Sequence, residues 1–135
     1  MERRRTQSGS PFEATIGFSR AVRRGAHVYV SGTAPVWPDG RCDPDAAQQA
    51  RRCFSIIDSA LRELGSGLPD VARTRMFLVS ADDAAAVGRV HAELFSDDPP
   101  AATMVVVAGL LDSRWRIEVE AEAVLPMEPG RAHEP

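Results

Sequence analysis

The chain has 135 residues, of which 44% are hydrophobic and 26% are charged, and its formal net charge is -3. This length suits one domain with a real hydrophobic core, and no apolar run approaches the roughly 18–20 residues that a membrane span needs. A negative net charge gives phosphate backbones no general attraction, so the composition argues against nucleic acid and membranes as partners.

The chain contains no lysine, since all 16 basic residues are arginine. This excludes Schiff-base catalysis through lysine and a P-loop lysine. Cys42 and Cys53 match no zinc spacing, and the histidines are isolated, so we expect neither a metal site nor a cofactor. The charged N-terminus is not followed by an apolar stretch, which predicts no secretory signal peptide and a cytoplasmic protein.

The first part of the chain is polar. Residues 1–12 predict a flexible N-terminal segment, ahead of a single domain over 13–125 and a flexible tail over 126–135. Residues 15–22 and 27–31 are typical of strands, and a turn at 23–25 would join them in a hairpin.

A long amphipathic helix follows. Asp43 is its predicted N-cap, with Pro44 at the first helical position and Gly65 just beyond its end. Apolar residues recur on one face of this helix: Ala46, Ala50, Cys53, Phe54, Ile57, Ala60, Leu61 and Leu64. Residues 71–79 then predict a strand.

A second helix is predicted to start at Ser80, where Asp83 resembles a capping-box partner, and His91 on its apolar face is interpreted as a packing residue. Residues 103–108 and 115–125 are predicted strands. The latter alternates, with glutamates at 118, 120 and 122 on one face and apolar residues on the other. The order of elements predicts an α+β domain with a mixed sheet, both helices on one face and the other face uncovered.

Several short motifs in this order resemble the RidA/YjgF family over about residues 11–125. They are Gly17-Phe18-Ser19-Arg20-Ala21-Val22, Ser31-Gly32-Thr33-Ala34-Pro35, Asp70-Val71 with Arg73 and Phe77, Phe95, Pro100-Ala101-Ala102-Thr103, and Ile117-Glu118-Val119-Glu120-Ala121. No single motif is specific, but the ordered set is.

The resemblance implies a chorismate-mutase-like α+β fold assembled as a homotrimer, with the helix-free sheet faces packed around the threefold axis. A pocket would lie at each subunit interface. In the family's archetype this pocket hydrolyses 2-imino acids or their enamine tautomers to 2-keto acids and ammonia. A signature arginine holds the substrate carboxylate, and a glutamate positions the attacking water.

Carried over by resemblance, Glu118 falls on the water-positioning glutamate. Ser31 and Gly32 fall on the pocket wall. Phe18 replaces the pocket tyrosine and so lacks its hydroxyl, and Thr33 stands where the family usually has glutamine.

The signature arginine itself is absent. Ala102 stands in its place, next to Thr103, and residues 99–109 contain no arginine. An arginine–carboxylate pair contributes about 1.5–3 kcal/mol, so its loss should weaken the handling of small imino acids by roughly tenfold to several hundredfold. Met104 shares a strand face with Ala102, and the pair would make the pocket wall apolar.

Two interpretations of the charged residues stay open. Glu118 is either a general base or part of a polar strand face that pairs with arginines across the trimer. Arg20 and Arg75 are either replacements for the missing cation or members of such inter-subunit ion pairs.

Two classes of function follow. The first is an enzyme related to imine and enamine deaminases that acts on a small metabolite other than the archetypal 2-imino acid. The second is a non-catalytic trimer that binds small molecules or protects other proteins.

Overall fold

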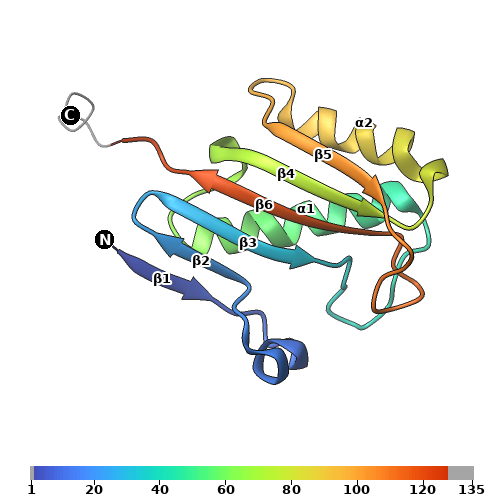
Figure 1. Cartoon of the computed structure of the whole chain (residues 1–135), viewed down its shortest axis with the longest axis horizontal. Coiled ribbons are helices and arrows are strands. Elements are labelled where there is room, and N and C mark those ends of the chain that lie inside the picture. Colours follow the sequence, from blue (N-terminus) through green and yellow to red (C-terminus); the bar gives the residue numbers. More distant parts are fainter. Residues whose placement is uncertain (1, 128–135) are drawn as a thin grey trace.

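The computed structural model describes residues 2–127 of the chain, which form one six-stranded sheet and two main helices (Figure 1). The strands are β1 (Arg3–Thr6), β2 (Ala21–Arg24), β3 (His27–Thr33), β4 (Val71–Leu78), β5 (Ala101–Val106) and β6 (Ile117–Val124). The helices are α1 (Ala46–Glu63) and α2 (Ala84–Phe95), with the short helices η1 (Glu13–Gly17), η2 (Leu68–Asp70) and η3 (Ala81–Asp83).

The sheet is mixed, with the strand order β1-β2-β3-β6-β4-β5. Only β4 and β5 run parallel, because α2 connects them, and the other neighbours are antiparallel. Both helices lie behind the sheet in Figure 1, α1 across β3 and β6 and α2 beside α1. The predicted α+β fold, with both helices on one face, is therefore confirmed.

The hydrophobic core lies between α1 and the central strands. In β6 the alternation places Ile117, Val119, Ala121 and Ala123 against the helices, all of them buried. On α1 the predicted apolar face is buried as well, and Gly65 ends the helix with φ +85°, a backbone conformation that favours glycine.

His91 has the predicted packing role. Its Nε2 lies 2.8 Å from the Thr74 hydroxyl, and its ring packs edge-on against Phe54. Burial lowers the pKa of His91, which favours the neutral ring in this apolar surrounding.

The N-terminal part differs from the expectation of a flexible segment over 1–12. Residues Arg3–Thr6 form β1, which pairs antiparallel with β2. The strand predicted over 15–22 is also wrong in its first half, because Glu13–Gly17 form a π-helical turn. The buried carboxylate of Glu13 accepts hydrogen bonds from the Ser8 amide and hydroxyl, and Gly17 ends the turn with φ +89°. These hydrogen bonds stabilise the turn in place of the strand pairing that the sequence predicts for these residues. Most of the predicted tail over 126–135 lies outside the described residues.

Both predicted helix starts need correction. Asp45, not Asp43, caps α1, since its side chain accepts from the Gln48 amide at 3.0 Å. Asp43 lies in the loop before the helix, where its side chain accepts a hydrogen bond from the Asp45 amide. Ser80 caps the short helix η3, which leads into α2, but the Asp83 side chain makes no capping hydrogen bond in return. Its carboxylate pairs with a side chain outside the helix, Arg116, at 2.9 Å through both oxygens.

Candidate functional site

The uncovered face of the sheet carries the charged side chains of β6. Glu118, Glu120 and Glu122 alternate with the buried apolar residues and so lie on the face opposite the helices. The register pairs Glu118 with Phe77 and Glu120 with Arg75 on β4. Glu118 is therefore placed near the start of the central strand, at the end of the sheet where β3 and β4 finish.

A β-bulge shapes the backbone next to Glu118. The register between β3 and β6 shifts between Val30 and Thr33, so β3 carries one extra residue there. Gly32 lies in this bulge. A Cβ atom at Gly32 would overlap the Glu118 carboxylate, with its carboxyl carbon only 3.2 Å away. The absence of a side chain at position 32 thus leaves room for the Glu118 carboxylate.

Arg20 provides the positive charge nearest to Glu118. Its Nη2 donates to the Gly32 carbonyl at 2.6 Å, and its backbone is held between Thr6 and Ser31 by hydrogen bonds of 2.7 and 3.0 Å. Its Nε is buried and has no hydrogen-bond partner in the described structure. Arg20 is thus fixed in place and retains an unused donor.

Burial is the main cause of the pKa shifts of Glu118 and Arg20. It raises the pKa of Glu118, against the opposing effect of Arg20, and Glu120 raises it further. Burial also lowers the pKa of Arg20, against the effects of Glu13 and Glu118. The buried Cys53 lies close enough to feel both charges, and burial raises the pKa of its thiol. Glu118 is therefore a carboxylate with a stronger affinity for a proton than an exposed glutamate has.

These side chains open into a cavity of about 860 Å³. Five of the residues predicted for the site line it: Phe18, Arg20, Ser31, Gly32 and Glu118. Ser31 is held by its hydroxyl, which donates to the Ser19 carbonyl at 2.7 Å. The volume lies within the range of roughly 300–1,000 Å³ that is usual for small-molecule sites.

The other predicted site residues are not part of this lining. Thr33 is fully buried and donates its hydroxyl to the Ser31 carbonyl. Ala102 is exposed on the edge strand β5, and Met104 packs against the core. Thr103 accepts a hydrogen bond from Arg73 at 3.0 Å. Within one chain, the segment that lacks the arginine is thus separate from the Glu118 cavity.

Arg75 is already engaged. Its Nη1 lies 3.4 Å from the Glu120 carboxylate and 3.2 Å from the Glu122 carboxylate. All three side chains belong to the same chain and are between 35% and 38% exposed. Of the two arginines considered as replacement cations, Arg20 lies in the cavity and Arg75 does not.

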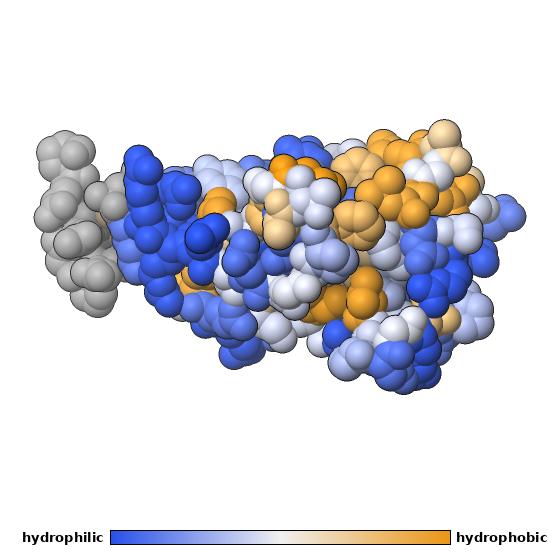
Figure 2. Space-filling model, turned by 90° about the horizontal axis from the view of Figure 1, so that it is seen from below, coloured by the Kyte–Doolittle hydropathy of each residue, from blue (hydrophilic) through white to orange (hydrophobic). Residues whose placement is uncertain are grey.

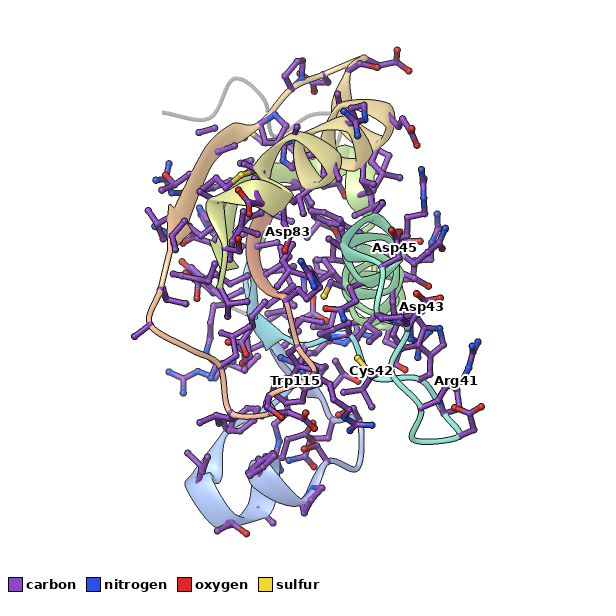
Figure 3. All side chains as sticks on the ribbon, turned by 90° about the vertical axis from the view of Figure 1, so that its right-hand side faces the viewer. Arg41, Cys42, Asp43, Asp45, Asp83 and Trp115 are labelled. Carbon is purple, nitrogen blue, oxygen red and sulfur yellow. The ribbon has the colours of Figure 1, made fainter. Side chains whose placement is uncertain are left out.

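Two loops that the sequence did not mark as functional form the outer wall of the cavity. Residues 34–42 follow β3, and residues 111–115 precede β6. Figure 3 shows Cys42 and Trp115 where these loops meet, with Arg41 on the outer side. Trp37 also lines the cavity, and the Arg41 guanidinium lies 5.6 Å from the centre of its ring.

Gln49 of α1 links the two loops through hydrogen bonds of its side chain. It is fully buried, and its Nε2 donates to the carbonyls of Asp43 at 2.8 Å and Arg114 at 3.0 Å. Its Oε1 accepts from the Arg116 amide at 2.7 Å. One buried amide therefore sets the position of both loops. The only signal in the sequence is a polar residue at an apolar helix position.

Apolar side chains are also exposed around this end of the molecule. They include Phe12, Ile16, Val36, Val105, Val106 and Leu111. Figure 2 shows hydrophobic residues gathered toward the right-hand end of the view. No group of three His, Cys, Asp or Glu side chains suited to hold a metal occurs among residues 2–127. Neither main helix in that range is long and apolar enough to cross a membrane.

The fold agrees with comparisons to known proteins. A family model described as Endoribonuclease L-PSP matches residues 9–125. The chain belongs to the RidA/YjgF family, to which that model corresponds.

Among its relatives is the uncharacterized protein SCO2049 of Streptomyces coelicolor. The two are 44% identical over 123 residues, which cover 89% of this chain and 90% of that protein. The structure is similar to that of Rv2704 from Mycobacterium tuberculosis, a member of the YjgF/YER057c/UK114 family, with 37% identity and a TM-score of 0.85 over 92% of this chain and 100% of that one. It is also similar to TM0215 from Thermotoga maritima, described as a putative endoribonuclease, with 28% identity and a TM-score of 0.81 over 94% and 100% of the two chains.

Proposed function

We propose that the chain hydrolyses the C=N bond of a small imine, or of its enamine tautomer, in the cavity beside Glu118. The observation that carries this proposal is the Glu118 carboxylate, which is half-buried, held beside the Gly32 backbone and raised in pKa by burial. Such a group can accept a proton from water near neutral pH and return it. Membership of the RidA/YjgF family supports this reaction class.

The proposed reaction needs no cofactor. Glu118 takes a proton from water as the water oxygen attacks the imine carbon, and the C=N π electrons move to nitrogen, which takes up a proton from solvent water. The resulting carbinolamine collapses as its hydroxyl returns a proton to solvent water and its C–N bond breaks. Glu118 delivers the proton that makes ammonia the leaving group, so a keto compound and ammonia are formed and the carboxylate is restored.

In this proposal Arg20 takes the role of the missing cation. It lines the cavity, and no acidic side chain in the described structure forms an ion pair with it. A carboxylate on the substrate would pair with the guanidinium group and offset its desolvation. Phe18 would add apolar contact where the family has a hydroxyl.

We also propose that the chain forms a homotrimer through its uncovered sheet face. The exposed side chains of Tyr29 and Val105 on that face, together with the Arg75 ion pairs, support an interface with apolar and polar parts. Sedimentation velocity of the wild type is expected to give a trimer, and Val105→Asp should lower its mass. A monomeric wild type would remove this part of the proposal.

The direct test of the reaction measures ammonia release from imines generated in the assay by an amino-acid oxidase. The wild type should accelerate release, and Glu118→Gln should reduce kcat by roughly 10²–10⁴-fold. Glu93→Gln is the matched control, since Glu93 is an exposed glutamate on α2, away from the cavity and the uncovered sheet face, and this variant should retain activity. If the wild type accelerates no imine, the catalytic proposal is wrong and the non-catalytic binding function takes its place.

A further inference from the structure

The cavity does not end at Glu118. It continues between the two loops to an apolar wall formed by Trp37, Ile56, Leu111 and Trp115. These residues come from the loop after β3, from α1 and from the segment before β6. They are far apart in sequence, and the Gln49 hydrogen bonds fix the loops that carry the two tryptophans.

Most of the charged side chains that line the cavity are basic. Four arginines line the cavity, Arg20, Arg41, Arg52 and Arg114, against a single acidic side chain, Glu118. Arg41 and Arg114 are paired with Asp39 and Asp112. Arg52 donates to the Val36 carbonyl at 2.7 Å and has no ion pair among residues 2–127. An anionic ligand therefore complements the cavity, and a cationic one does not.

The size of the cavity indicates a ligand with a large apolar part. A volume of about 860 Å³ far exceeds what the carbon skeleton of a three-carbon imino acid would fill. Such a substrate would leave the tryptophan wall in contact with water, and that contact is unfavourable for apolar surface. A ligand with a bulky apolar arm would displace this water and bury the apolar surface of the wall, which favours binding.

We propose that the Trp37–Trp115 wall is a specificity subsite for an aromatic or long branched side chain, and that the substrates are imino acids which carry one. Their carboxylate is held at Arg20, and their reacting carbon faces Glu118. This inference rests on the proposed function for its chemistry, but the binding subsite can be measured without turnover. Its occupant is a small carboxylate with an apolar arm, and the competing occupant is a loop of a neighbouring subunit.

The chain contains only two tryptophans, and both line the cavity, so intrinsic fluorescence reports on this wall directly. The probes are 2-oxo-4-phenylbutanoate and pyruvate, which share the carboxylate and keto group and differ in the apolar arm. We expect 2-oxo-4-phenylbutanoate to shift the tryptophan emission and to bind at least tenfold more tightly than pyruvate. Ile56→Ala and Trp37→Phe should each weaken the larger probe several-fold and leave pyruvate unchanged.

Leu94→Ala is the control, because Leu94 is exposed on α2 and is not part of the cavity lining. Equal binding of the two probes would overturn the inference. Emission that changes on dilution of the protein but not with either probe would also overturn it, since a neighbouring subunit would then cover the wall.

The ammonia assay separates this inference from the proposed function. Selective binding of the larger probe without ammonia release from any imine would refute the catalytic proposal and support the subsite. Release at equal kcat/KM from the imines of alanine and phenylalanine would support catalysis and refute the subsite. A preference of tenfold or more for the phenylalanine-derived imine, lost in Trp37→Phe, is the result that we expect.

Discussion

The carboxylate of Glu118 occupies the space beside Gly32 in which any other residue would place its Cβ atom. The neighbour that would have to move is the end of a flexible side chain and not a backbone segment. A substitution at Gly32 should therefore disturb the position of the carboxylate much more than it disturbs the fold.

Gly32→Ala tests this relationship. We expect it to lower kcat for imine hydrolysis by about 10²-fold, close to the effect of Glu118→Gln, because the carboxylate is displaced from the bulge. The free energy of unfolding should change by no more than about 1 kcal/mol. Chemical denaturation and the ammonia assay on the same preparation give both numbers. A variant that keeps full activity would show that the position of Glu118 is not critical.

The raised pKa of Glu118 predicts how stability depends on pH. Because the folded-state pKa lies above the usual value of 4.5, folding favours the protonated carboxyl. This contribution is complete below the unfolded-state pKa and is lost as pH rises through the folded-state pKa. Glu118→Gln should therefore have a higher Tm than the wild type at pH 7–8, and the difference should vanish below about pH 4. Thermal melts across this range measure it. A difference that is constant with pH would contradict the assignment.

The same shift predicts the pH profile of catalysis. A general base must be ionised, so kcat/KM should fall toward acid with a limb above the ordinary glutamate range. Arg20→Ala removes a charge that favours the carboxylate and should move this limb to higher pH. It should also raise KM for carboxylate-bearing imines by roughly tenfold or more. If the limb stays at the same pH in Arg20→Ala, Arg20 does not influence the ionisation of the catalytic base.

Gln49 should contribute strongly to stability. Gln49→Ala removes a buried side chain and leaves the carbonyls of Asp43 and Arg114 and the amide of Arg116 without their hydrogen-bond partner, which should cost about 3 kcal/mol or more. Gln48→Ala is the matched control, because Gln48 is exposed one residue earlier on the helix, and it should change stability by less than about 0.5 kcal/mol. Urea denaturation measures both. Equal losses in the two variants would argue against a role for the buried amide.

Asp83 offers a similar comparison. Its carboxylate accepts two hydrogen bonds from Arg116 and is largely buried, so Asp83→Asn should cost about 2 kcal/mol. Asp82→Asn changes an exposed neighbour whose side chain makes no such contact, and its effect should be close to zero. Denaturation midpoints with unchanged slopes would measure the difference. A larger loss in Asp82→Asn would contradict this account.

Much of the fold could be predicted from the sequence because hydrophobic period and burial coincide in α1, β4 and β6. The alternation of β6 correctly places Glu118 on the uncovered face. Phe18, Ser31 and Gly32, which the resemblance to the family singles out, line the cavity. The position of Asp45 as the cap of α1 depends on which of two nearby aspartates meets the Gln48 amide, and composition does not distinguish them.

The outer half of the cavity could not be predicted in this way. Trp37 and Trp115 have no periodic neighbours and are brought together by loops that a buried Gln49 fixes. The π-helical turn at Glu13–Gly17 likewise depends on one buried carboxylate and on Gly17. The loop positions come from tertiary hydrogen bonds and the turn from a local contact between Ser8 and Glu13, and hydrophobic periodicity encodes neither. A glycine within a strand pattern, such as Gly32, is a sequence signal for a bulge that could have been used.

Strand β1 forms one edge of the sheet. Its outer hydrogen-bonding groups pair with no other strand among residues 2–127, and such an edge strand is a template for a second copy. Arg3, Arg4 and Arg5 are all exposed on this strand. Two molecules that approached edge to edge would bring two rows of guanidinium groups into register, and their mutual repulsion would oppose growth of a continuous intermolecular sheet. The arginine run would therefore disfavour aggregation through this sheet edge.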